Sequence, residues 1–108
     1  MNIEQLRDYC LSKSEAEEGF PFGEETLVFK VKNKIFLLTS LEKQPVQFNV
    51  KCDPEKAIEL REKYSCVLPG YHMNKKLWNT VIADGTLSVK QLHGFIDDSY
   101  ELVSRKAK

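Results

Sequence analysis

The sequence predicts a single α+β domain in which helices pack on one face of an antiparallel sheet, in the order α-β-β-β-α-β-α. Near both ends of the chain and near its middle, apolar residues recur with the period of a helix. Between these segments apolar and polar residues alternate, which is typical of half-buried strands. The links between the first three strands are too short for the crossovers of a parallel sheet. We expect one domain over residues 1–108.

The first predicted helix covers residues 3–11 and follows Asn2, whose side chain is suited to cap it. Glycine, proline and glutamate then dominate residues 13–25, so this stretch is predicted to be a loop. We expect the aromatic rings of Phe20 and Phe22 to pin the loop to the domain.

Three strands are predicted next, and they form an antiparallel meander. Apolar residues alternate with lysines over residues 27–31, and residues 33–34 are suited to a tight turn because asparagine tolerates positive φ. Residues 35–41 are more continuously apolar, as a central strand is. Residues 46–51 alternate again.

Asp53 and Pro54 open the second predicted helix, with aspartate as the cap and proline at the first helical position. The side chains assigned to its buried face are Ala57, Ile58, Leu60 and Tyr64. Residues 65–76 are expected to be irregular around the Pro69-Gly70 turn.

A fourth strand is predicted over residues 77–83, and the last helix begins after Ser88, a suitable cap. One face of the strand carries Trp78, Thr80 and Ile82. Gly94 lies inside the last helix, where glycine is about 1 kcal/mol less favourable than alanine. Its presence there predicts close packing against a neighbouring element.

Composition excludes two classes of protein. Apolar residues make up 42% of the chain and charged residues 30%, with 16 basic and 16 acidic side chains. A neutral chain is unlike a histone-type protein, whose whole surface is basic. The sequence contains no apolar run long enough for a membrane helix and no secretory leader, so we expect no membrane partner.

The neutral total hides an uneven distribution. Residues 1–25 carry two basic and seven acidic side chains, whereas residues 26–108 carry 14 basic and 9 acidic ones. The basic part includes Lys30, Lys32 and Lys34 beside the predicted hairpin turn. These three lysines would point the same way across the sheet only if the strand continued unbroken through the turn.

The three cysteines, Cys10, Cys52 and Cys66, are an odd number at wide spacing, and no CxxC pair is present. This pattern favours free thiols in a cytoplasmic protein, with no disulfide and no zinc site. Cys10 is expected to be buried, and the other two to be more exposed. No cofactor is expected.

Residues 69–81 form the segment most suggestive of a functional site. This segment places lysines, asparagines and aromatic rings where a loop enters a strand. Lysines with interleaved aromatics suit nucleic acid, because ammonium groups bind phosphates and rings stack on bases. Other roles remain open: Trp78 in the core, Asn74 and Asn79 as loop hydrogen-bonding groups, and His72 as a structural histidine.

The same segment resembles the signature of the MmcQ/YjbR family of small bacterial proteins. Further resemblance lies in residues 20–23, 28–31, 34–36, 49–55 and 96–103. The chain departs from the signature at Leu77, where the family often has a histidine, so a metal-binding or catalytic role for that position is not expected here.

The resemblance implies a CyaY-like (frataxin-like) fold and a non-enzymatic DNA-binding function with little sequence specificity. It places the functional surface on Lys51, Tyr71, His72, Asn74, Lys75, Lys76, Trp78 and Asn79.

Three other functions are considered. The acidic stretch Glu15–Glu25 and an exposed aromatic loop would suit a module that binds a still unidentified protein. A frataxin-like metal site would use oxygen ligands from Glu4, Asp8, Glu15, Glu17 and Glu18. An enzyme is not expected, because the sequence has no GxGxxG, P-loop, GxSxG or HExxH motif.

Overall fold

The computed structural model describes residues 1–71 and 73–106. The helices are α1 (Ile3–Leu11), α2 (Pro54–Lys63) and α3 (Val89–Lys106). The strands are β1 (Glu17–Gly19), β2 (Thr26–Val31), β3 (Lys34–Ser40), β4 (Gln47–Lys51), β5 (Val67–Pro69) and β6 (Trp78–Ile82). They form one antiparallel sheet with the strand order β1-β2-β3-β4-β6-β5. The predicted α+β class and the meander are confirmed.

Two short strands were not predicted. β1 pairs with β2 at one edge of the sheet, and β5 pairs with β6 at the other. Each has three residues, which is too short for alternation to stand out in the sequence.

The loop before β2 is held differently from the prediction. Phe20 and Phe22 are 48% and 64% exposed, so the expectation that their rings pin this loop is wrong. The β1–β2 pairing holds it instead, together with Arg7 of α1, which donates two hydrogen bonds to the Glu18 carboxylate at 2.6 and 2.7 Å.

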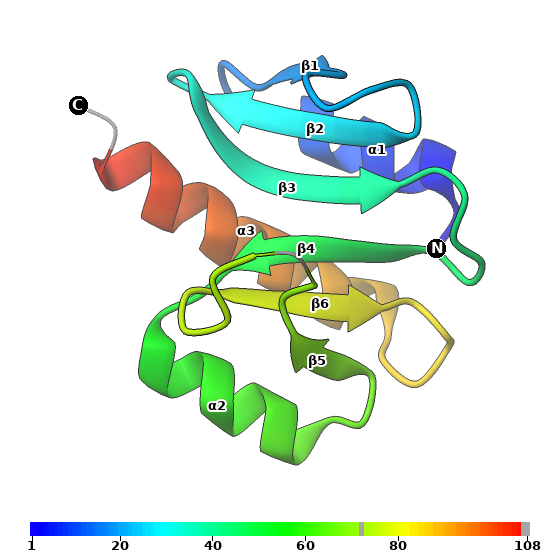
Figure 1. Cartoon of the computed structure of the whole chain (residues 1–108), viewed down its shortest axis with the longest axis vertical. Helices are drawn as coiled ribbons and strands as arrows, with labels where there is room; N and C mark the ends of the chain where they lie inside the picture. Colours follow the sequence, from blue (N-terminus) through cyan, green and yellow to red (C-terminus); the bar gives the residue numbers. More distant parts are fainter. Residues whose placement is uncertain (72, 107–108) are drawn as a thin grey trace.

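α1 and α3 lie on one side of the sheet, as predicted, and α2 packs against the same core from the edge formed by β5 and β6 (Figure 1). α1 and α3 run behind the strands, and α2 lies beside β5 and β6. The main core fills the space between them and includes Phe29, Phe36 and Phe48 from the strands with Leu6 and Ile96 from the helices. The other face of the sheet, called the open face below, carries no described helix and faces the viewer in Figure 1.

The predicted caps of α1 and α2 are confirmed. Asn2 Oδ1 accepts from the Gln5 backbone N–H at 2.8 Å, and Gln5 Oε1 accepts from the Asn2 backbone N–H at 2.9 Å, which completes a capping box. The Asp53 carboxylate accepts from the backbone N–H of Glu55. In contrast, Ile58 is 50% exposed and does not belong to the buried side of α2.

Gly94 does not pack closely against a neighbour, so that prediction is wrong. A Cβ atom built on Gly94 would meet no heavy atom within 4 Å outside its own helix neighbourhood. The helix therefore has room for a side chain at this position.

A β-bulge in β3 is tied to α3 by one buried hydroxyl. Phe29 pairs with Leu37 and Lys30 with Ile35, which leaves Phe36 as the extra residue. Ser99 Oγ donates to the Phe36 carbonyl at 2.5 Å and accepts from the Lys51 backbone N–H at 2.8 Å. This single side chain therefore aligns β3, β4 and α3.

Candidate functional site

Two hollows lie beside a small apolar cluster of the open face: one is on the open face itself, and the other is at the end of the sheet where β2 and β3 meet α3. The cluster contains Val28, Leu38 and Trp78. The first hollow, called the apolar groove, has a volume of about 410 Å³. Its lining residues are Phe22, Thr26, Leu38, Thr39, Ser40, Lys43, Gln47, Phe48, Asn49, Tyr71 and Met73. The second, called the basic cleft, has a volume of about 530 Å³ and is lined by Lys30, Asn33, Lys34, Ile35, Lys51, Trp78 and Val103.

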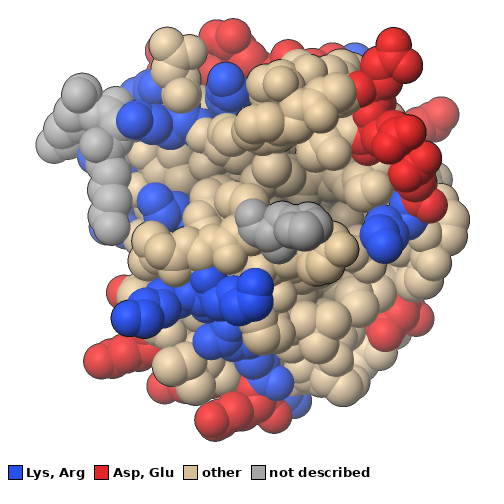
Figure 2. Space-filling view, in the orientation of Figure 1, with Lys and Arg blue, Asp and Glu red and all other residues tan. Residues whose placement is uncertain are grey.

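Three strands each contribute one lysine to the basic cleft. Lys30 comes from β2, Lys34 from β3 and Lys51 from β4. None of the described residues that line this cleft is acidic. Figure 2 views the open face and shows basic side chains gathered toward the left of that view. The cleft is therefore a local positive surface on a chain with no net charge.

Lys32 does not join the other hairpin lysines. Lys32 and Asn33 have φ values of 51° and 68°, which form the tight turn between β2 and β3. The strand is therefore broken at this point, and the condition for all three lysines to point the same way is not met. Lys32 Nζ instead donates to the carbonyl of Ser104 on α3 at 3.4 Å.

The loop that enters β6 is anchored to the sheet and to α2. The Leu77 carbonyl accepts from the Cys52 backbone N–H at 2.8 Å, which holds the loop beside the end of β4. Arg61 of α2 donates to the Lys75 carbonyl at 2.9 Å. Lys75 and Lys76 are exposed residues of this loop, and Lys75 Nζ donates to the Gly70 carbonyl at 3.4 Å.

Asn74 shapes this loop, as one of the open sequence interpretations supposed. Its side-chain oxygen accepts from the Lys76 backbone N–H at 2.9 Å. Its carbonyl accepts from the backbone N–H groups of Leu77 and Trp78. Asn74 therefore turns the chain into β6.

Tyr71 lies on the groove side of the loop, apart from the basic cleft. It is 59% exposed and lines the apolar groove, while its backbone N–H donates to Thr80 Oγ1 at 3.0 Å. The Asn49 side chain donates to the Tyr71 carbonyl at 3.3 Å. His72, also predicted as a site residue, lies outside the described residues.

Trp78 and Asn79 are buried: Trp78 lies in an apolar cluster, as one of the open interpretations supposed, whereas Asn79 does not lie on the exposed surface where the resemblance placed it. Trp78 is 9% exposed and packs with Val28 and Leu38, although it also forms part of the cleft wall. Asn79 is 1% exposed and donates from Nδ2 to the Ala57 carbonyl of α2 at 3.2 Å. Successive strand residues face opposite sides of the sheet, so Asn79 points to the helices.

The cysteines are free and buried, and none of them is suited to nucleophilic chemistry. Cys52 and Cys66 are 7% and 2% exposed, so the expectation that they are more accessible is wrong. Burial raises the pKa of the Cys10 thiol to about 12 and also raises the pKa values of the other two thiols. The reactive thiolate form is disfavoured at all three positions.

The acidic residues near the N-terminus do not form a metal centre. The hydrogen bonds from Arg7 lower the pKa of Glu18, so this carboxylate is already engaged. Within residues 1–71 and 73–106, no three histidine, cysteine or carboxylate side chains converge on one point. In the same part of the chain, no helix has the length and apolar character needed to cross a membrane.

A cluster of polar side chains links helices α1 and α3. Tyr9 of α1 donates to the Asp97 carboxylate of α3, and Lys13 forms an ion pair with the same carboxylate. The Tyr9 ring stacks on His93 with centroids 3.6 Å apart. These contacts join α1 to α3.

These features define a small α+β domain with a six-stranded antiparallel sheet, three helices, an apolar groove on the open face and a basic cleft at one end of the sheet. The chain belongs to the YjbR family, whose family model matches residues 11–102. The resemblance seen in the sequence is thereby confirmed.

Relatives and solved structures agree with this assignment. The chain is 34% identical over 102 residues to the uncharacterized protein YjbR of Escherichia coli K12, covering 94% of this chain and 86% of that protein. It is 45% identical over 85 residues to the uncharacterized protein YbdF of Escherichia coli O157:H7, covering 78% and 69%. A Deinococcus radiodurans crystal structure with a DUF419 domain matches with a TM-score of 0.94 and 38% identity, over 99% of this chain and 81% of that one. The match to a Pseudomonas syringae crystal structure has a TM-score of 0.81 and 31% identity, covering 95% and 99%.

Proposed function

We propose that the protein is a non-enzymatic DNA-binding protein that holds the phosphate backbone in the basic cleft, with little sequence specificity. The observation that carries this proposal is the placement of Lys30, Lys34 and Lys51 around one cleft whose described lining contains no carboxylate. Three ammonium groups on neighbouring strands suit a row of phosphates, which carry no sequence information.

The surroundings of the cleft support the same proposal. Lys75 and Lys76 are exposed on the loop that is anchored beside the end of β4, and they add two positive charges to this part of the molecule. Trp78 supplies an apolar wall against which sugar or base edges can pack. Because the whole chain is neutral, we expect modest affinity that depends strongly on salt. Three free, buried thiols suit a cytoplasmic location for this function.

A matched pair of double variants tests the proposal. In K30Q/K51Q two cleft lysines lose their charge, whereas K63Q/K90Q removes the same charge from exposed positions on α2 and α3. We expect the cleft variant to make the slope of log affinity against log salt shallower by about 1.8, since each lost phosphate contact contributes about 0.9. The control variant should keep the wild-type slope. Fluorescence anisotropy of a labelled mixed-sequence duplex, titrated from low to physiological salt, measures both slopes.

Two results would contradict the proposal: no binding of the duplex at low salt, or equal slopes for the two variants. Absence of binding would favour the alternative function, in which the protein is a module that binds another protein. A pull-down that still recovers this partner after nuclease treatment would reveal it. Circular dichroism of both variants shows whether the sheet is intact.

A further inference from the structure

We propose that the apolar groove is a binding site for a small organic anion, with a planar apolar body in the groove and its anionic group beside Lys43. The proposal is independent of the DNA-binding function, because the groove and the basic cleft lie on either side of the Val28, Leu38 and Trp78 cluster.

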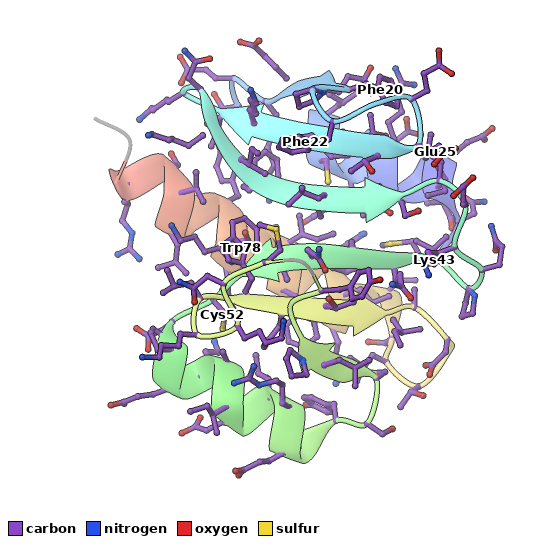
Figure 3. The ribbon with its side chains drawn as sticks, in the orientation of Figure 1. Phe20, Phe22, Glu25, Lys43, Cys52 and Trp78 are labelled. Atoms are coloured by element: carbon purple, nitrogen blue, oxygen red, sulfur yellow. The ribbon has the colours of Figure 1, made fainter. Side chains whose placement is uncertain are left out.

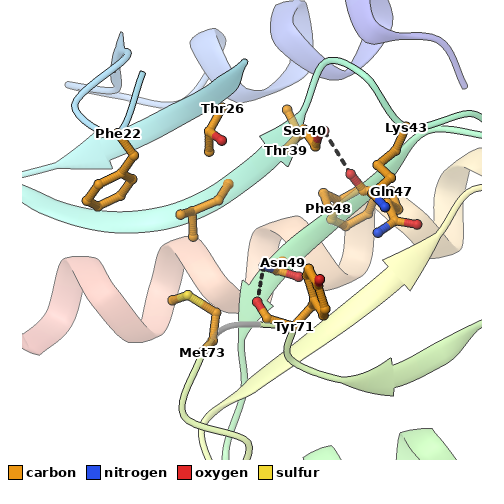
Figure 4. A pocket seen from close by; sticks show the side chains of 11 residues that line it. Phe22, Thr26, Thr39, Ser40, Lys43, Gln47, Phe48, Asn49, Tyr71 and Met73 are labelled. Carbon is orange, nitrogen blue, oxygen red and sulfur yellow. Dashed lines mark hydrogen bonds between the residues drawn. The ribbon is translucent and has the colours of Figure 1, made fainter. Parts of the chain in front are cut away.

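The groove has the size and shape of a small-molecule site. Its volume of about 410 Å³ lies within the range of pockets that hold organic ligands. β3 and β4 form its floor (Figure 4). Phe22, from the loop before β2, stands on one side, and Tyr71 and Met73, from the loop after β5, stand on the other. Three separate segments of the chain therefore enclose one space.

Hydrogen bonds hold the wall of the groove in place. Thr80 Oγ1 donates to Asn49 Oδ1 at 2.5 Å, and Asn49 Nδ2 donates to the Tyr71 carbonyl at 3.3 Å. Thr39 Oγ1 donates to the Gln47 carbonyl at 2.8 Å and fixes the floor. A ligand would thus meet a preformed wall and floor, which reduces the entropy lost on binding.

The exposed aromatic rings indicate an apolar partner. Phe22 is 64% exposed and Tyr71 is 59% exposed, yet both line the same hollow. Phe22 adds little to the core at this exposure, and burying it against a ligand would be favourable. Planar ligands gain further from ring stacking. In Figure 3 the Phe22 side chain lies in front of β2, while Phe20 of the same loop lies away from it.

Lys43 sets the charge of the expected ligand. It is the one charged residue among the described residues that line the groove. Its ammonium lies 6.0 Å from the centroid of the Tyr71 ring and forms no ion pair with a described carboxylate. A carboxylate or sulfonate on the ligand would pair with this cation. The side chains of Thr26, Ser40 and Gln47 add polar groups around the same space.

Two fluorescent probes that have the same rings but differ in charge test two contacts separately: the packing of the rings in the groove and the pairing of an anionic group with Lys43. Anilinonaphthalene sulfonate carries a negative charge, and N-phenylnaphthylamine is neutral. We expect the wild-type protein to bind one equivalent of the sulfonate with increased fluorescence. Lys43→Gln should lower the affinity for the sulfonate by roughly threefold to tenfold and leave the affinity for the neutral probe unchanged. Phe22→Ala should lower the affinity for both probes by roughly tenfold, because each probe loses its contact with the Phe22 ring.

The chain offers matched controls for each variant. Phe20→Ala removes an exposed ring from the same loop outside the groove and should change neither affinity. The K30Q/K51Q variant should also bind the sulfonate as the wild type does, because the probe does not occupy the basic cleft. The proposal is wrong if the folded wild-type protein binds neither probe. It is equally wrong if Phe22→Ala and Lys43→Gln bind as tightly as Phe20→Ala.

Discussion

Replacing Gly70 with alanine is expected to lower the free energy of unfolding by about 2 kcal/mol, because the new methyl group overpacks a tight contact. A Cβ atom at this position would lie 2.8 Å from both the Cβ and the carbonyl oxygen of Trp78. These atoms belong to the β6 backbone or are fixed to it, so the loop itself must shift. Tyr71 and Met73 line the apolar groove, and Trp78 lines the basic cleft, so the shift would alter both hollows.

Gly94→Ala is the matched control, with an expected change of opposite sign. The Gly94 position is open, and alanine is favoured over glycine in a helix by about 1 kcal/mol. Thermal unfolding should show a melting temperature lower by about 10 °C for Gly70→Ala and higher by about 4 °C for Gly94→Ala. Equal melting temperatures for the two variants would contradict the close approach of Gly70 to β6.

Ser99→Ala is expected to destabilise the protein by about 2–3 kcal/mol, because two backbone groups lose a buried hydrogen-bond partner. The Phe36 carbonyl loses its donor and the Lys51 N–H loses its acceptor. Both lie at the bulged end of the sheet that presents Lys34 and Lys51, so phosphate binding should also weaken.

Urea unfolding measures this loss of stability. Ser104→Ala, on the same helix, is the control, and we expect it to change the unfolding free energy by less than about 0.5 kcal/mol. If Ser99→Ala unfolds at the same urea concentration as the control, the hydroxyl does not carry the link between α3 and the bulge.

The order of the main elements was predictable because each leaves a strong local signal. Asn2 and Asp53 cap their helices as expected, and the turn at Asn33 joins two strands. β1 and β5 were missed because three-residue edge strands depend on their neighbours for definition. The free space around Gly94 could not be predicted either, because a single sequence does not show which residues pack against a given helix position.

The candidate site was predicted in part. Lys51 was expected near the functional surface, and it lies in the basic cleft beside Lys30 and Lys34. Asn79 was misplaced although the sequence held the signal: if Trp78 and Thr80 share one face of a strand, the residue between them points to the other.

The roles of Phe22 and Lys43 in the groove were not predicted. Phe22 lies in the loop before β2 and Lys43 in the loop that joins β3 to β4, and both side chains border the groove in Figure 4. They are 21 positions apart in the chain. A pairing of this kind depends on the tertiary structure, and no spacing rule in the sequence indicates it.

The most direct test of the central claim is to locate bound DNA by nuclear magnetic resonance. Backbone amide spectra of the labelled protein are recorded while a short duplex is added at low salt. The account predicts that the shifted amides cluster at Lys30, Asn33, Lys34 and Lys51 and in the loop over residues 74–77, and that the shifts reverse when salt is raised. Shifts confined to α1 and the Tyr9–Asp97 cluster, or no shifts at all, would contradict the assignment of the basic cleft as the phosphate-binding surface.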